Sequence, residues 1–285
     1  MNGSTLVSVI IPVLNDAVGL RSTLAALDQL PPTLRVHLEV IVKDGGSSDG
    51  FFETVADFLH TLDHIESSQD LGIYDAMNRG VARAQGAWVW FLGAGDLPDP
   101  EGLEEMLAVA QEHSQSQEHS QSQEHSQSQE HPRPVGPQPD IAMAACVQAL
   151  PPLEPGVPSE FVPRWDWRLM WRNTIHHQGL WIPRSWLVER PLDTSFPVLG
   201  DYAWLLQLRH SQAPVACHPH VVIARVQAGG HSRQFTPSLY LEEWRIKRQH
   251  LPRVWMLAQA FWLPLKWAFK LSSKTLRSLG SSTPQ

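Results

Sequence analysis

Cysteine is scarce in this chain. Cys146 and Cys217 are the two cysteines among 285 residues, and they form no CxxC pair. A small fold held together by disulfides is therefore excluded, and so is a CxxC site. Such cysteine usage fits reducing surroundings, so we expect a cytosolic rather than a secreted protein. The length and the 42% hydrophobic content allow one large domain or two small ones.

Long apolar runs are also missing. The first residues, MNGSTLVSVIIPVLND, have no basic segment, and their apolar run is too short for a signal peptide. Residues 254–265 (VWMLAQAFWLPL) are apolar except for Gln259, but a membrane span needs roughly 20 residues. We therefore expect the first run to be a strand and no segment that crosses a membrane.

Acidic residues are absent from residues 244–285, which hold eight Lys and Arg. Because the whole chain carries −7, residues 1–243 carry −15. An acidic body argues against binding to nucleic acid, and a basic, Trp-rich tail favours contact with an anionic membrane surface. We expect a main domain over residues 1–243 and a helical tail over residues 244–285.

Apolar runs alternate with helical patterns along the first hundred residues. We expect strands at 6–14, 38–43 and 88–92, and helices at 51–62 and at 74–84, the last closed by Gly86. A further helix, capped by Asn15 or Asp16, carries Leu20, Leu24 and Leu27. This alternation predicts an α/β fold with a mostly parallel sheet. Residues 140–150 read as another strand.

Residues 112–131 repeat EHSQSQ and contain no apolar side chain. They cannot join a core, so we expect a disordered insertion at about 112–139. A metal-binding His tract is the alternative. Steps of six residues rotate a helix by about 240°, so His113, His119 and His125 would not share a face.

Tryptophans gather between residues 160 and 190. They either fill the core or form a platform for a sugar or lipid, because indole suits sites with one apolar and one wet edge. Further on, residues 254–265 suggest a helix that dips into the membrane interface, or one docked on the domain itself. The basic residues that follow would form one stripe on a helix. The tryptophans are Trp165, Trp167, Trp171, Trp181 and Trp186, and the basic residues are Lys266, Lys270, Lys274 and Arg277.

Two carboxylates follow predicted strands. Asp44 comes after LEVIVK, and Asp96 closes WVWFLGAGD among glycines. Ligands of open parallel sheets bind at the carboxyl ends of the strands, and two carboxylates there suit a nucleotide with a divalent cation. Each Asp alone could instead be a local cap of a turn or helix.

Three segments together resemble a known family: VSVIIPVLND, VIVKDGGSSDG and DLGIYDAMNRGVARAQGAWVWFLGAGD. They look like the inverting, family 2 type of nucleotide-sugar glycosyltransferase with the GT-A fold, a Rossmann-like sheet flanked by helices. The resemblance implies that Asp44 contacts the nucleoside and that Asp96 holds Mg²⁺ or Mn²⁺ on the diphosphate. The donor site it implies comprises Pro12, Asn15, Asp44, Gly45, Ser47, Gly72, Asp75, Asn78 and Arg79.

The resemblance resumes in three later pieces, in the family's order. NTIHHQGLWIPRSW resembles a strand before the acceptor region, and LGDYAWLLQL resembles the segment with the catalytic base, which gives that role to Asp201. GGHS resembles a loop near the active site. The implied acceptor side comprises His177, Gln178, Trp181, Gly230 and His231.

The acidic motif departs from the family, because Gly93 and Gly95 stand where further carboxylates are usual. A cation would then depend more on diphosphate and water, with His176 or His177 assisting. We expect an enzyme that transfers sugar to a lipid-linked or polysaccharide acceptor at the cytoplasmic membrane face. A catalytically silent, donor-binding homologue is the alternative. A nucleotidyltransferase is disfavoured, because Asn15 to Val18 do not form a Gly-rich phosphate loop.

Overall fold

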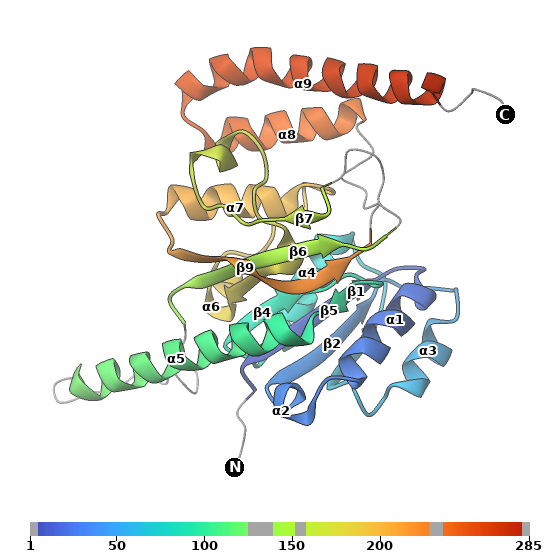
Figure 1. Ribbon diagram of the computed structural model, residues 1–285, viewed down its shortest axis with the longest axis vertical. Helices are drawn as coiled ribbons and strands as arrows, with labels where there is room; N and C mark the ends of the chain where they lie inside the picture. Colours follow the sequence, from blue (N-terminus) through green and yellow to red (C-terminus); the bar gives the residue numbers. More distant parts are fainter. Residues whose placement is uncertain (1–4, 125–138, 152–157, 228–235, 281–285) are drawn as a thin grey trace.

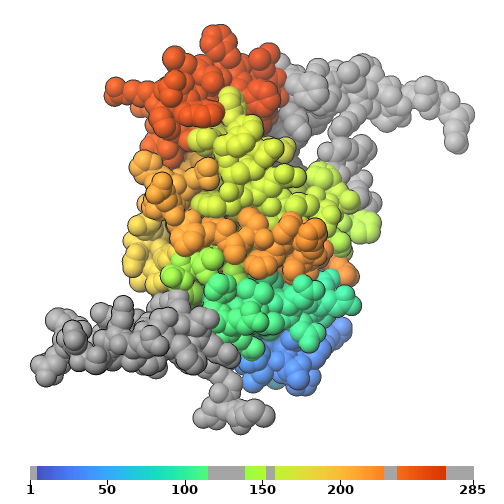
Figure 2. All heavy atoms as spheres, turned by 60° about the vertical axis from the view of Figure 1, so that its left-hand side comes forward, coloured from blue at the N-terminus to red at the C-terminus, as the bar shows by residue number. Residues whose placement is uncertain are grey.

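The computed structural model describes residues 5–124, 139–151, 158–227 and 236–280. Its strands form one sheet in the order β3-β2-β1-β4-β8-β6-β9-β5, and β7 pairs with β6 (Figure 1). Helices cover both faces of this sheet, and the last two helices form an outer layer at one end of the molecule (Figures 1 and 2).

The N-terminal half of the sheet is parallel, as predicted. Its strands are β1 (Val7–Val13), β2 (Leu38–Asp44), β3 (His64–Ser67) and β4 (Trp88–Phe91). Alternate side chains of β1 enter two cores, because successive residues of a strand point to opposite faces. Val7, Val9 and Ile11 join one core, whereas Ile10 joins the other.

The helices of this half each bury one apolar stripe. Helix α1 (Ala17–Asp28) packs its leucines into the first core with α3 (Phe51–Asp57), while α4 (Ile73–Arg83) packs into the second. Asp16 caps α1 through its side chain, which accepts from Gly19 N at 2.9 Å. A short helix, α2 (Pro32–Arg35), leads into β2.

The second half of the sheet is mixed. β8 (Leu180–Pro183) runs antiparallel to both β4 and β6 (Ala142–Ala149), and β6 runs parallel to β9 (Val215–Val226). The short strands β5 (Leu97–Pro98) and β7 (Glu160–Phe161) add antiparallel pairs. Helix α5 (Pro100–Glu124) lies against β9. The predicted strand at 140–150 is confirmed as β6.

The second core is closed by the helices that follow. These are α6 (Arg184–Glu189), α7 (Gly200–His210), α8 (Pro237–His250) and α9 (Arg253–Gly280), with two short 3₁₀ turns, η1 (Trp167–Met170) and η2 (His177–Gly179). The predicted boundary at 243/244 falls inside α8, whose Ile246 is fully buried in the second core. The division into two domains stays a prediction.

Three local predictions need correction. Helix α3 ends at Asp57, and residues 112–124 of the EHSQSQ repeat continue α5 as helix rather than being disordered; residues 125–138 lie outside the described chain. Gly86 does not close α4, whose C-cap is Ala84. Gly86 is instead needed for close packing, because a Cβ there would lie 2.6 Å from Ser8 N.

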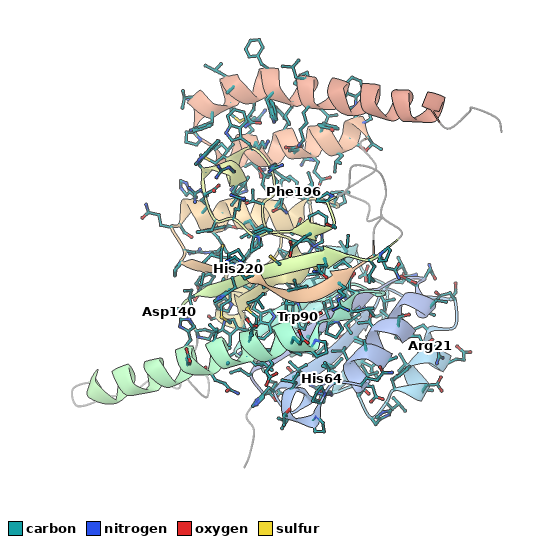
Figure 3. The ribbon with its side chains drawn as sticks, in the orientation of Figure 1. Arg21, His64, Trp90, Asp140, Phe196 and His220 are labelled. Atoms are coloured by element: carbon teal, nitrogen blue, oxygen red, sulfur yellow. The ribbon has the colours of Figure 1, made fainter. Side chains whose placement is uncertain are left out.

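The tryptophans divide between core and surface. Trp181 is fully buried beside Trp90, with ring centroids 6.0 Å apart, whereas Trp167 is exposed. Trp90 lies in the interior near α5, while Arg21 lies at the outer edge of the molecule (Figure 3). Among the described helices, none has the length and apolar character needed to cross a membrane.

The contact between α5 and β9 predicts a strong effect of Gly102→Ala. A Cβ at Gly102 would lie 1.8 Å from Val222 O. Overpacking of this kind lowers the free energy of unfolding by about 1–3 kcal/mol, although Ala is favoured over Gly within a helix. Chemical denaturation measures this change in the free energy of unfolding. Glu104→Ala on the exposed side of α5 is the control, expected within about 0.5 kcal/mol of wild type. A more stable Gly102→Ala protein would contradict this packing.

Candidate active site

The carboxyl ends of β1, β2 and β4 meet at one edge of the sheet, where two loops are tied together. Asn15, at φ 52°, donates its N–H to Ser47 Oγ at 2.7 Å, and its Oδ1 accepts from Ser48 N at 3.0 Å. Asp49 accepts from Ala17 N at 2.8 Å. Pro12 is buried in β1 opposite Lys43, so it supports this edge and presents no exposed side chain to a ligand.

Asp44 is fully buried, and its predicted contact with the nucleoside stays a prediction. Its carboxylate accepts from Gly46 N, Ser47 N and the hydroxyls of Ser47 and Ser67. Burial raises the pKa of Asp44, but the hydrogen bonds from Ser47 and Ser67 hold it below its usual value. Asp44 therefore orders the turn that carries Ser47, as in the local-cap alternative.

Asp70, which the sequence prediction did not single out, lies beside Gly45. Its Oδ2 would lie 2.8 Å from a Cβ at Gly45, so the carboxylate fills the place of a side chain at that position. Lys43, also fully buried, places its Nζ 4.0 Å from Asp70 Oδ2 and donates to Ser68 O at 2.7 Å. The consecutive glycines 45 and 46 were the sequence signal for such a close approach.

The predicted donor-binding face of α4 is used largely within the protein. Asn78 contacts Leu192 through both ends of its side-chain amide: Nδ2 donates to Leu192 O at 2.8 Å and Oδ1 accepts from Leu192 N at 2.9 Å. Its contact with the donor stays a prediction. Asp75 forms an ion pair with Arg79 on this helix, with Asp75 Oδ2 2.9 Å from Arg79 Nη2. Gly72, at φ +119°, is exposed, and a Cβ added there would have no neighbour within 4 Å.

Asp96 closes the turn after β4 and faces inward. Its Oδ2 accepts from Gly93 N at 2.7 Å and from Gln178 Nε2 at 2.9 Å. Burial raises the pKa of Asp96, and the hydrogen bonds from Gln178 and Gly93 offset only part of this. It does not cap α5, because Asp99 accepts from Gly102 N at the start of that helix.

The glycines around Asp96 follow from this geometry. A Cβ at Gly93 would lie 2.8 Å from Asp96 Oδ2, and Gly95 has φ +91°, a conformation that side chains disfavour. A carboxylate at either position would disturb the turn. The single Asp of FLGAGD is therefore a consequence of how the Asp96 side chain folds back over position 93.

Turn η2 joins Asp96 to Asp201. Gln178 contacts Asp96, and the preceding His177 places its Nδ1 3.6 Å from Asp201 Oδ2. Strand β4 also contacts this turn, because Trp90 Nε1 donates to Gln178 O at 2.7 Å. The structure thus brings together the predicted metal residue, the predicted base and two predicted acceptor-side residues.

Asp201 lies in the first turn of α7 with its side chain 21% exposed. Tyr74 Oη is 3.2 Å from Asp201 Oδ1, and Asn173 Nδ2 is 3.4 Å from Oδ2. Burial raises the pKa of Asp201, but His177, Tyr202 N–H and Tyr74 together hold it below its usual value. Asp201 is therefore ionised at neutral pH and able to accept a proton. Tyr74 and Asn173 were not predicted.

The residues allow a cation only with help from a substrate. Within the described part of the chain, no three His, Cys, Asp or Glu side chains gather as metal ligands. Gly93 N and Gln178 Nε2 both donate to Asp96 Oδ2, and the backbone of Gln227 gives the carboxylate a further hydrogen bond. An ionised carboxylate has about four lone-pair sites, so one more ligand can be accepted. One carboxylate plus phosphate and water is a ligand set that Mg²⁺ accepts. Asp96 thus fits a site of this type.

One further predicted acceptor-side residue lies within the described chain. Trp181 is fully buried in β8, and its contact with an acceptor stays a prediction. Gly230 and His231 lie outside the described residues. His176 stacks on His177 with ring centroids 5.5 Å apart.

Comparison with known proteins decides the family. The model of the glycosyl transferase family 2 matches residues 8–152, which include Asp44, Asp96 and the glycines around them. The chain belongs to this family. It is therefore a glycosyltransferase with a GT-A fold, as the sequence resemblance implied.

A relative from Mycobacterium tuberculosis, the PGL/p-HBAD biosynthesis glycosyltransferase, is 28% identical over 246 residues, 82% of each chain. Among solved structures, S. aureus TarS 1-349 in complex with UDP matches with TM-score 0.60 and 16% identity; the match covers 86% of this chain and 65% of TarS 1-349. The mannosyltransferase PcManGT of Pyrobaculum calidifontis, in complex with GDP-Man and Mn²⁺, matches at TM-score 0.55 and 18% identity over 98% of this chain and 76% of its own.

The contacts of Asp201 predict how its pKa responds to His177→Asn. This change removes an interaction that lowers the pKa, while the burial that raises it remains, so the pKa of Asp201 should rise. Titration of the carboxyl carbon signals by NMR measures it. His60→Asn, which removes a partner of the distant Asp28, should leave Asp201 unchanged. An unchanged Asp201 in His177→Asn would mean that His177 does not stabilise the carboxylate.

Proposed function

We propose that this glycosyltransferase moves a sugar, with inversion, from a nucleotide-sugar donor to a lipid-linked or polysaccharide acceptor in cell-surface glycan biosynthesis. One observation carries the proposal: η2 brings the ionised Asp201 and the buried Asp96 to the same turn. A base and a carboxylate beside the leaving group are what inverting transfer requires. The names of the relatives support a nucleotide-sugar donor and a role in biosynthesis.

Asp201 acts as the general base in this proposal. The acceptor hydroxyl attacks the anomeric carbon from the face opposite the leaving diphosphate, the bond to the diphosphate breaks, and the hydroxyl proton passes to Asp201. Tyr74 and Asn173 hold the two carboxylate oxygens in place. Because the pKa of Asp201 is lowered, the carboxylate is ready to take the proton at neutral pH.

The donor lies along the edge where β1, β2 and β4 end. Asn15, Ser47 and the exposed Gly72 face the nucleoside side, with Asp70 and Gly45 between them. When bound, Mg²⁺ or Mn²⁺ neutralises the charge that develops on the leaving diphosphate. Asp96 is the residue that holds this cation. The acceptor reaches Asp201 from the side of His177, at the cytoplasmic face of a membrane.

Replacing the base gives the first test of the proposal. Asp201→Asn keeps the size of the side chain but cannot accept a proton, so the rate of transfer should fall about 10²- to 10⁴-fold. The rate is measured with a panel of nucleotide sugars and a membrane extract as acceptor. Asp57→Asn, which removes a surface partner of Arg21, is the matched control and should stay active.

The outcomes of this test separate two functions. If wild type and Asp201→Asn were equally inactive with every donor but still bound a donor, the enzyme hypothesis would be rejected. The protein would then be a catalytically silent homologue that binds the donor. The buried, single carboxylate at Asp96 is the observation that favours that second candidate.

The cation assigned to Asp96 gives a separate prediction. Mn²⁺ should raise the transfer rate of wild type and of Asp57→Asn, and EDTA should reverse this. Asp96→Ala should lose most of the response to Mn²⁺, because the carboxylate that holds the cation is gone. Full Mn²⁺ stimulation of Asp96→Ala would show that the cation is held elsewhere. Circular dichroism and thermal unfolding check that Asp96→Ala is folded like wild type.

A further inference from the structure

Helix α9 buries a polar side chain against the protein and exposes apolar side chains on its other side. From residue 254 to 265 the one polar side chain is Gln259, and it is fully buried. The exposed large side chains of this stretch are apolar, and the four most exposed are Val254 (70%), Leu257 (71%), Phe261 (76%) and Leu265 (64%). A helix that packs on a protein and otherwise meets water shows the opposite pattern.

These four residues, called here the outer face of α9, form one continuous row. At 100° per residue they fall within about 80° of one another. Helix α9 is the outermost layer at its end of the molecule, and no other described element lies over its outer side (Figures 1 and 3). An exposed apolar row of this kind is typical of a surface that binds another protein or a membrane.

The inner side of α9 is fixed by polar contacts, so the helix cannot roll to bury the row. Gln259 Oε1 accepts from the buried Lys247 Nζ at 2.9 Å, and Gln259 Nε2 donates to Met170 O at 3.3 Å. Lys266 Nζ bonds both oxygens of Glu243, at 2.8 and 3.0 Å. Turning the helix would leave these buried groups without partners, at a cost of about 1–3 kcal/mol each.

The basic residues around the outer face indicate which kind of partner covers it. Residues 244–285 contain eight basic and no acidic residues, with Arg253 before the apolar row and Lys270, Lys274 and Arg277 after it. A second copy docked on this face would bring two such segments together and be repelled. Anionic lipid attracts them, whereas the remaining residues, which carry −15, are repelled from the same surface.

We propose that the outer face of α9 binds the surface of an anionic membrane, with the four apolar side chains inserted among the lipids. The apolar row supplies burial, and the basic residues at both of its ends supply attraction to the headgroups. Binding to the membrane does not rest on the proposed function. The choice of a lipid-linked acceptor does rest on it, because a membrane-bound enzyme meets acceptors that the membrane holds.

Vesicle sedimentation of the full-length protein tests the proposal. The variant replaces two residues of the outer face, Leu257→Gln with Phe261→Gln, and the matched control replaces two apolar residues exposed elsewhere, Phe52→Gln with Leu59→Gln. Wild type and control should sediment with phosphatidylcholine vesicles that contain phosphatidylglycerol. The outer-face variant should bind about tenfold or more weakly. Binding of wild type should weaken in high salt and without phosphatidylglycerol.

Two results would overturn the proposal. In the first, the outer-face variant sediments with the anionic vesicles as well as wild type. In the second, wild type forms a dimer in analytical ultracentrifugation that the variant abolishes, which would make a second copy the occupant. Asp201→Asn separates this test from the proposed function: it should bind vesicles like wild type while losing transfer, and the outer-face variant should keep donor hydrolysis.

Discussion

The candidate active site depends on one turn, η2, whose two consecutive side chains hold two carboxylates from distant parts of the chain. His177 lies against Asp201 and Gln178 bonds Asp96. Trp90 Nε1 donates to the backbone oxygen of Gln178, and a Cβ at Gly179 would lie 2.4 Å from Ala145 O, so the turn is packed closely against β4 and β6. The buried strand β4 therefore helps to set the positions of both Asp201 and Asp96.

The same device of a glycine facing a carboxylate occurs twice at this edge of the sheet. Asp96 fills the place of a side chain at Gly93, and Asp70 fills the place of a side chain at Gly45. In both cases a carboxylate from another residue occupies the space that a side chain at the glycine would take. Asp96 is itself the acidic residue of FLGAGD, so position 93 gains no second carboxylate. A side chain at either glycine would displace the carboxylate that lies there.

The predictable part of the fold was the part set by local periodicity. The strands β1, β2 and β4 and the helices α1 and α4 follow from runs and stripes of apolar residues, and the fold class followed from their alternation. Local periodicity did not reveal partners that are remote in sequence: Asp44 accepts a hydrogen bond from Ser67, and Asn78 donates one to Leu192. No spacing rule reveals such a partner, because the contact exists only once the sheet has assembled. The prediction of disorder for residues 112–124 was wrong for a different reason. A helix that begins with the buried part of α5 can continue through polar residues.

Helix α8 connects the outer layer to the site through two neighbouring glutamates. Glu242 Oε1 accepts from Val198 N at 3.0 Å and Leu199 N at 2.7 Å, just before Asp201, and Glu243 binds Lys247 and Lys266. The two side chains leave the helix about 100° apart, so one faces α7 and the other faces α9. Hydrogen bonds and ion pairs of α8 thus connect α9 to the residues that precede the first turn of α7.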